Sequence, residues 1–272
     1  MIESAQATPA TATRFERLWA TKNKDDEWWS SFVTSPIAIA LNMVVVDWPI
    51  LTPNRITVLS MLAGGVASFL IVKGGFYSFL WAVFFLHLSH IFDCMDGQMA
   101  KYRGISSPFG SYFDKVTDQL KVFLFFGAAA YAAYKQTGEV TPVFLGFIGV
   151  SFYFIRVYVK YLTIFIEMEN DPEYLADCSA VAAKQRGTQK AHSSSRIWNG
   201  LLWFLGEQRK FFLFNETVFI FLISFGLLFD RLTEILWVFA VSQVYYGLRR
   251  SFQRGSQIYR SHHLDLLKPL EK

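Results

Sequence analysis

The sequence is short of charged residues for a soluble protein of its length. Only 18% of its 272 residues are charged, whereas a soluble domain usually carries nearer a quarter. This shortage excludes two ordinary soluble domains, because the 53% of hydrophobic residues gather in long apolar runs between short polar stretches. The pattern predicts a membrane protein with several spans.

Cysteines are scarce, and the N-terminal residues do not have the pattern of a signal peptide. Cys94 and Cys178 could pair once at most, and we interpret both as free thiols, which suits a site facing the cytosol. Residues 1–30 mix acidic and basic side chains and contain no apolar core, so we expect no cleavable signal peptide. No internal repeat is evident.

Six apolar runs are long enough to cross a bilayer. Each has roughly 18 or more residues, which at 1.5 Å per residue covers about 30 Å of hydrocarbon. The sequence therefore predicts an all-α polytopic membrane protein with six transmembrane helices. The runs lie at 55–74, 77–99, 110–134, 143–166, 212–229 and 232–250.

A less regular segment, residues 13–50, precedes the first run. Its charged start and later tryptophans predict a juxtamembrane amphipathic helix that lies on the membrane. A seventh span at 36–50 is the competing interpretation, although Asn42, Asp47 and Pro49 interrupt it.

Lysine and arginine concentrate in the N-terminal segment, in the loops after the second and fourth runs, and in the tail. By the positive-inside rule, both termini and these loops face the cytoplasm. We predict an N-terminal cytoplasmic or interfacial segment, a six-helix membrane catalytic domain and a cytoplasmic tail. Their bounds are 1–51, 52–252 and 253–272.

Four aspartates flank the connection between the second and third runs. Asp93 and Asp96 end the second run, and Asp114 and Asp118 begin the third. Spacings of three and four place each pair on one helical face, and the short connection lets the two faces converge near the cytoplasmic edge. Carboxylates at membrane depth are costly and rarely without a function.

Converging carboxylates repel one another unless cations neutralise them. Oxygen ligands favour hard ions, so Mg²⁺ or Mn²⁺ is the expected occupant, and two such ions would clamp a pyrophosphate. Small residues at Gly97, Ala100 and Gly110 leave room for a nucleotide or let the helices pack closely, and Lys101 offers a charge to phosphate.

The competing interpretation makes these aspartates helix caps and surface charges at the ends of spans. They would then pair with Lys101, Arg103 and Lys115. A single aspartate would fit that role, but two helical pairs with glycines beside them favour a functional site.

The segment resembles the signature of the CDP-alcohol phosphotransferase (CDP-alcohol phosphatidyltransferase) family, D-x2-D-G-x2-A-R-x8-G-x3-D-x3-D. The matching positions are Asp93, Asp96, Gly97, Ala100, Lys101, Gly110, Asp114 and Asp118. Lys101 stands where the family usually has arginine, and lysine cannot form the bidentate fork of arginine. The six-span layout with a juxtamembrane helix is also similar to the family's.

The resemblance implies that Asp93, Asp96 and Asp114 bind two metal ions, and that Asp118 contributes to this site and acts as the catalytic base. It implies direct attack of an acceptor hydroxyl on the β-phosphorus, with CMP leaving. The residues that it implies for binding the CDP-linked donor are Asn54, Thr57, Gly97, Ala100, Lys101, Ser107 and Gly110.

Two weaker features lie inside the apolar runs. Arg156 and Lys160 lie one turn apart and could bind an anionic acceptor, or they could snorkel or pair with the acidic cluster. His87, His90 and Asp93 recur every three residues, so a third metal site is conceivable, although His90 as a partner of Asp93 or simply packed is favoured.

The expected function is transfer of a phosphatidyl group from CDP-diacylglycerol to a small polar acceptor in phospholipid biosynthesis. One alternative is transfer of a CDP-linked headgroup or polyol phosphate to a lipid or polyol alcohol. The other is a cation transporter that uses the intramembrane aspartates. We expect membrane lipids but no nucleic acid as partners, and a homodimer is compatible with the resemblance.

Overall fold

The computed structural model describes residues 13–22, 29–171, 173–176, 178 and 214–267. Within these ranges the chain is helical apart from turns and connections, and it contains no strand, which confirms the all-α prediction. The chain forms two compact units. The first comprises Met1–Phe147 and Phe214–Val238, and the second comprises Ile148–Leu213 and Phe239–Lys272.

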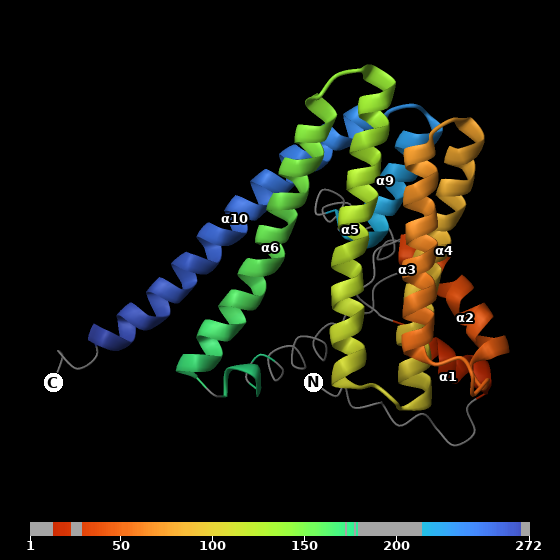
Figure 1. Ribbon diagram of the computed structural model, residues 1–272. Helices are drawn as coiled ribbons and strands as arrows, with labels where there is room; N and C mark the ends of the chain where they lie inside the picture. Colours follow the sequence, from red (N-terminus) through yellow and green to blue (C-terminus); the bar gives the residue numbers. More distant parts are fainter. Residues whose placement is uncertain (1–12, 23–28, 172, 177, 179–213, 268–272) are drawn as a thin grey trace, which may run out of the picture. The chain divides into compact units, whose positions relative to one another are not determined.

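The described ranges contain nine helical elements, and Figure 1 labels all of them except η1. They are α1 (Arg14–Ala20), the π-helix η1 (Ser30–Thr34), α2 (Ser35–Val45), α3 (Pro53–Lys73), α4 (Phe76–Arg103), α5 (Pro108–Thr137), α6 (Thr141–Asn170), α9 (Glu216–Leu228) and α10 (Leu232–Leu267). Most belong to the first unit, and α6 and α10 continue into the second.

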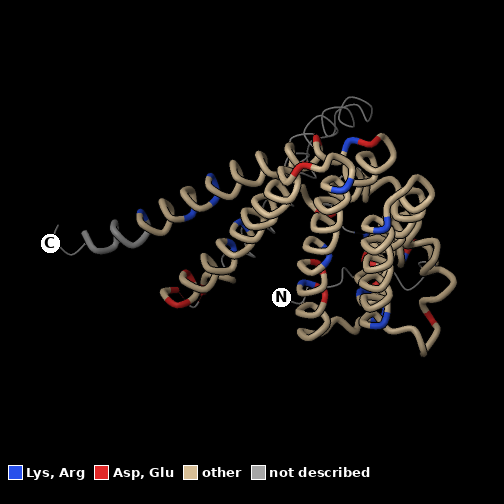
Figure 2. The backbone as a smooth tube through the Cα atoms, turned by 45° about the horizontal axis from the view of Figure 1, so that its top comes forward, with Lys and Arg blue, Asp and Glu red and all other residues tan. Residues whose placement is uncertain are grey.

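Each predicted span coincides with a helix, in order α3, α4, α5, α6, α9 and α10. By length and composition, α3, α4 and α6 can cross a bilayer, and α9 is a shorter apolar helix. Figure 2 shows long stretches of these helices without charged residues. Six spans remain a prediction, and residues 212–213 of the fifth lie outside the described ranges.

Glycines lie at or between the ends of the predicted runs, where the helices end. Gly74 and Gly75, with φ of 77° and 90°, join α3 to α4, and Gly104, with φ of 65°, ends α4. Side chains with a Cβ rarely adopt these backbone conformations, so the glycines set the helix ends.

Helix α3 packs against both α4 and α5, and Figure 1 shows the three helices close together. Its buried positions are mostly small, and Gly64 lies so close to Phe125 that an added Cβ would be 3.1 Å from the ring. The hydroxyls of Ser60 and Ser89 each donate to the other residue's carbonyl oxygen at 2.8 Å. Small residues let membrane helices approach closely, which brings the first turns of α3 to the acidic residues.

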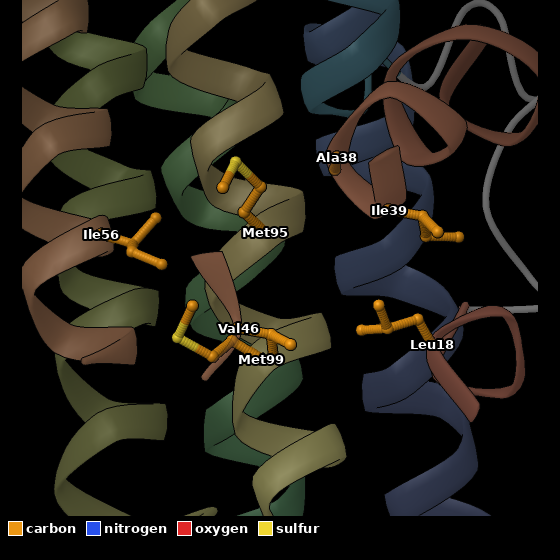
Figure 3. Packing of buried hydrophobic residues seen from close by; sticks show 7 residues of the cluster. All are labelled: Leu18, Ala38, Ile39, Val46, Ile56, Met95 and Met99. Carbon is orange, nitrogen blue, oxygen red and sulfur yellow. The ribbon is translucent and has the colours of Figure 1, made fainter. Parts of the chain in front are cut away.

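In the described part of the N-terminal segment, α1 ends at Ala20 and a second helix runs without a break through η1 and α2, so the predicted interfacial helix is not confirmed. Leu18 of α1 and Ile39 of α2 are buried in an apolar cluster (Figure 3). The other residues of the cluster are Ala38, Val46, Ile56, Met95 and Met99. An apolar face that packs on other helices has the same sequence pattern as a lipid-facing one.

Asn42, one of the residues that interrupt the possible seventh span at 36–50, lies on α2 and is fully buried against α4. Its side-chain amide donates to the Met95 carbonyl oxygen at 3.0 Å and to Gln98 Oε1 at 3.1 Å, and Gln98 Nε2 donates to the Ser35 carbonyl oxygen at 3.2 Å. The continuous helix Ser30–Val45 is too short to count among the spanning helices, so a seventh span receives no support.

In the second unit, α6 and α10 approach closely at two glycines. A Cβ on Gly149 would overlap the Phe239 ring at 2.4 Å, and one on Gly247 would lie 3.1 Å from Phe152. Glycine therefore permits this helix pairing.

The Arg103 side chain attaches the end of α4 to the turn between α2 and α3. Its guanidinium donates to the carbonyl oxygens of Val46, Trp48 and Leu51 at 2.6, 2.9 and 2.8 Å. One planar fork thus bonds to three carbonyl groups of this turn, of which that of Trp48 also accepts from the Leu51 N–H at 3.1 Å.

We expect Arg103→Gln to lower the free energy of unfolding by about 2 to 3 kcal/mol, because hydrogen bonds to a charged donor are lost. In detergent, the melting temperature should fall by roughly 5 °C or more. Arg103→Lys keeps the charge without the planar fork, so its melting temperature should lie between those of the wild type and Arg103→Gln. Wild-type melting of Arg103→Gln would contradict this role.

Candidate active site

The local sequence at residues 104–110 fixes where the two acidic helices end and begin. The backbone N–H of Ile105 bonds to the Ala100 carbonyl oxygen at 3.1 Å beyond the left-handed Gly104. The Ser107 hydroxyl then caps α5 by accepting from the Gly110 N–H at 3.0 Å, with Pro108 at the first helical position. Ser107, predicted to contact the donor, thus has a structural bond already.

Three of the four predicted aspartates converge. Ligand oxygens of Asp93 on α4 and of Asp114 and Asp118 on α5 all lie within 4.8 Å of one another. Their side chains remain 16%, 30% and 19% exposed, so a solute can reach them. We call these residues the three-aspartate group.

Asp96 is tied to α3 instead. It is buried, and its carboxylate accepts a hydrogen bond from the Thr57 hydroxyl. At the start of the same helix, Asn54 reaches α5, because a Cβ added to Gly110 would lie 3.3 Å from Asn54 Oδ1. The first turn of α3, predicted to lie near the nucleotide, therefore contacts both acidic helices.

The positions predicted to bind the donor on α4 lie beside open space. A Cβ on Gly97 would meet nothing within 4 Å, and Gly97 is exposed one turn after Asp93. Ala100 is half-buried and Lys101 is exposed in the last turn of α4. Of the two interpretations of Gly97, room for a ligand fits this geometry better than close helix packing.

Sequence reasoning missed Lys121 and Glu216. The Lys121 side chain is only 1% exposed, and its ammonium lies 2.6 Å from Asp93 Oδ1, 2.8 Å from Glu216 Oε1 and 3.2 Å from Asp118 Oδ1. A lysine inside an apolar run, one turn after Asp118, is a signal that could have found it. Glu216, a carboxylate inside the predicted run 212–229, carried the same kind of signal.

An exposed lysine also pairs with the three-aspartate group, as the competing interpretation predicts. Lys115 Nζ lies 2.7 Å from Asp114 and 3.2 Å from Asp118, and its side chain is 59% exposed. Arg103, by contrast, donates to the backbone carbonyl oxygens described above.

The two histidines of α4 contact α9. His90 Nε2 lies 3.2 Å from the Thr217 hydroxyl, and His87 Nε2 lies 3.4 Å from the Ser224 hydroxyl. His90, Asp93 and Glu216 could together approach a metal, but the Lys121 ammonium already contacts both carboxylates. Packing against α9 therefore accounts for the histidines better than a third metal site does.

Arg156 and Lys160 lie on α6 in the second unit. The Arg156 guanidinium lies 4.9 Å from the centre of the Tyr153 ring, and Lys160 Nζ lies 5.6 Å from that of Tyr161. The positive charge of Arg250 on α10 acts unfavourably on that of Arg156. Binding of an acceptor by Arg156 and Lys160 stays a prediction.

Apolar helices with a group of carboxylates beside open space define a membrane protein with the donors for a divalent cation. The family model for CDP-alcohol phosphatidyltransferases matches residues 50–242, well over half of the chain. The chain belongs to the CDP-alcohol phosphatidyltransferase family. No curated protein matched the sequence.

Membership settles the class of the protein. Members are transferases of substituted phosphate groups that use a CDP-linked donor, an alcohol acceptor and divalent metal ions. Together with the apolar helices, this makes the chain an integral membrane enzyme. The alternative of a cation transporter has no comparable support.

The three-aspartate group fits the family's metal, because all of its donors are carboxylate oxygens, the ligands that Mg²⁺ and Mn²⁺ prefer. We expect Asp114→Asn to weaken Mn²⁺ binding on the order of tenfold or more, because a ligand charge is lost. Binding would be measured on the purified protein by the loss of the free-ion electron paramagnetic resonance signal.

Asp47→Asn is the matched control, because Asp47 is an exposed aspartate that pairs with Arg14 at 2.7 Å outside this group. Its Mn²⁺ affinity should equal that of the wild type. Equal affinities in Asp114→Asn and Asp47→Asn would contradict a metal site at the three-aspartate group.

Proposed function

We propose that this enzyme transfers the phosphatidyl group of CDP-diacylglycerol to the hydroxyl of a small polar acceptor in phospholipid biosynthesis, with release of CMP. The observation that carries the proposal is the three-aspartate group beside the open space at Gly97, inside the segment that the family model matches. A carboxylate cluster that holds metal next to a space for a nucleotide suits transfer from a pyrophosphate.

Two ions, Mg²⁺ or Mn²⁺, would be held by Asp93, Asp96 and Asp114, with Asp118 contributing. When bound, such ions neutralise charge on the pyrophosphate and on the departing phosphate. Asp93 and Asp114 belong to the converging group, and the Thr57 hydroxyl holds Asp96 in a fixed orientation. Thr57 thus serves the site by positioning Asp96.

The donor would lie along the ends of α3, α4 and α5. Gly97 leaves the space, Lys101 supplies positive charge, and Asn54 provides a side-chain amide beside Gly110. Ala100 and Ser107 complete the predicted donor-binding residues. Lysine acts here as a point charge and not as a fork, so its contact to phosphate depends less on direction.

Asp118 would act as the base. Its carboxylate accepts the proton of the acceptor hydroxyl, while the hydroxyl oxygen forms a bond to the β-phosphorus. The bridging bond from the β-phosphorus to the oxygen on the α-phosphorus breaks, and CMP leaves with that electron pair. Holding donor and acceptor in line supplies most of the remaining acceleration.

The acceptor is expected to be anionic, since Arg156 and Lys160 are one turn apart on α6 and the positive charge of Arg250 acts unfavourably on that of Arg156, which an anion would relieve. Transfer of a CDP-linked headgroup to a lipid alcohol would require an apolar acceptor site instead. Basic residues near the ends of the apolar runs support an active site on the cytoplasmic side.

The function is tested by CMP release from CDP-diacylglycerol by the purified protein, offered glycerol phosphate, inositol phosphate or serine in turn. We expect release with at least one acceptor, and loss of it after chelation with recovery on adding Mg²⁺ or Mn²⁺. Turnover only with CDP-linked headgroups and diacylglycerol would favour the alternative, and full turnover after exhaustive chelation would exclude the metal.

The aspartates should separate by role. Asp118→Asn preserves shape but removes the proton acceptor, so turnover should drop on the order of a hundredfold or more while donor still binds. Asp96→Asn should instead weaken binding of both metal and donor. Single-turnover CMP release and metal-dependent donor binding would be measured on both variants. Normal turnover by Asp118→Asn would place the base elsewhere, with His90 the next candidate.

A further inference from the structure

The Lys121 ammonium lies deep in the first unit, against the inner side of the three-aspartate group. It contacts Asp93, Asp118 and Glu216 at 2.6 to 3.2 Å, and the Ser60 hydroxyl lies 3.5 Å away. A buried charge is tolerated only when it is paired and hydrogen-bonded. Lys121 meets both conditions, and its three carboxylate partners come from three different helices, α4, α5 and α9.

The two lysines at this site differ in their freedom to leave it. Lys115 is 59% exposed, so its stem can swing into solvent when another cation binds Asp114. Lys121 is 1% exposed, and the Ser60 contact and the carboxylates surround its ammonium. Its charge is therefore a permanent part of the site.

We infer that Lys121 and Glu216 form a fixed charge pair that sets the affinity of the site for divalent metal. This inference rests on the proposed metal-dependent function. Lys121 is a positioning residue, which holds one oxygen of Asp93 and one of Asp118 and leaves the other oxygen of Asp93 to a metal ion. The negative charge of Glu216 offsets part of the positive potential that the Lys121 ammonium exerts on those two aspartates.

The pair predicts opposite effects for its two members. Without the Lys121 charge, the site becomes more negative and attracts a divalent cation more strongly. Without the Glu216 charge, the ammonium acts fully on Asp93 and Asp118 and repels the cation. In a partly buried site, one unit charge a few ångströms away changes an affinity by about tenfold or more. Removing both charges together leaves the net charge of the site, and hence its affinity for the cation, close to that of the wild type.

The test is a double-mutant cycle on the full-length protein in detergent, with Mn²⁺ dissociation constants measured by electron paramagnetic resonance. We expect Lys121→Met to bind Mn²⁺ about tenfold more tightly than wild type and Glu216→Gln about tenfold more weakly. The double variant should return to within about threefold of wild type, which is the signature of a coupled pair.

Lys135→Met is the matched control. It removes the same charge from α5, fourteen residues further along and hence about 21 Å away, and it should leave Mn²⁺ affinity unchanged. If Lys121→Met does not fold, Lys121→Gln takes its place with the same expected result, because its amide can still donate to the buried carboxylates.

Weaker binding in both single variants, with effects that add in the double variant, would mean that the pair only supports the fold and would overturn the inference. So would an unchanged or tighter affinity in Glu216→Gln. If wild-type protein binds no Mn²⁺, the proposed metal site fails and the inference falls with it. If wild type binds Mn²⁺ and Asp114→Asn does not, but the lysine and glutamate variants match wild type, only the inference fails.

Discussion

Carboxylates that crowd together between apolar helices repel one another, and much of the first unit is arranged around their neutralisation. Lys121 supplies a positive charge from within, and Lys115 supplies one from the exposed side. Neither lysine pairs with Asp96 in the described contacts, and a hydroxyl from α3 holds that carboxylate instead. The site thus has a fixed positive charge on its inner side and an exchangeable one on its open side, where a divalent cation can take the place of the Lys115 ammonium.

Close packing of α3 makes these contacts possible. The reciprocal bonds between Ser60 and Ser89 and the absence of a side chain at Gly64 let α3 approach α4 and α5. Larger residues at these positions would move the α3 backbone outward. Thr57 would then lose Asp96, so residues with no reactive group determine the geometry of those that have one.

Local patterns in the sequence predicted the helices and the convergence of four aspartates, of which Asp93, Asp114 and Asp118 converge while Thr57 holds Asp96. Glycines mark the helix ends. The spacing of the aspartates places them on one face of each helix, and the short connection brings the two faces together. The contacts that escaped depend on packing between distant segments: Thr57 precedes Asp96 by 39 positions, and Glu216 follows Lys121 by 95. The predicted interfacial helix is not confirmed, since periodicity does not tell whether an apolar face contacts lipid or another helix, as at Ile39.

The buried amide of Asn42 has a consequence for how the chain is made. Its partner Gln98 is 56 positions later in the sequence, so at about 5 to 20 residues per second the ribosome needs roughly 3 to 11 seconds to deliver it. During that interval α2 has left the ribosome while the helix that completes its hydrogen bonds has not. The hydrogen bonds between α2 and α4 can therefore form only after α3 and most of α4 have been synthesised.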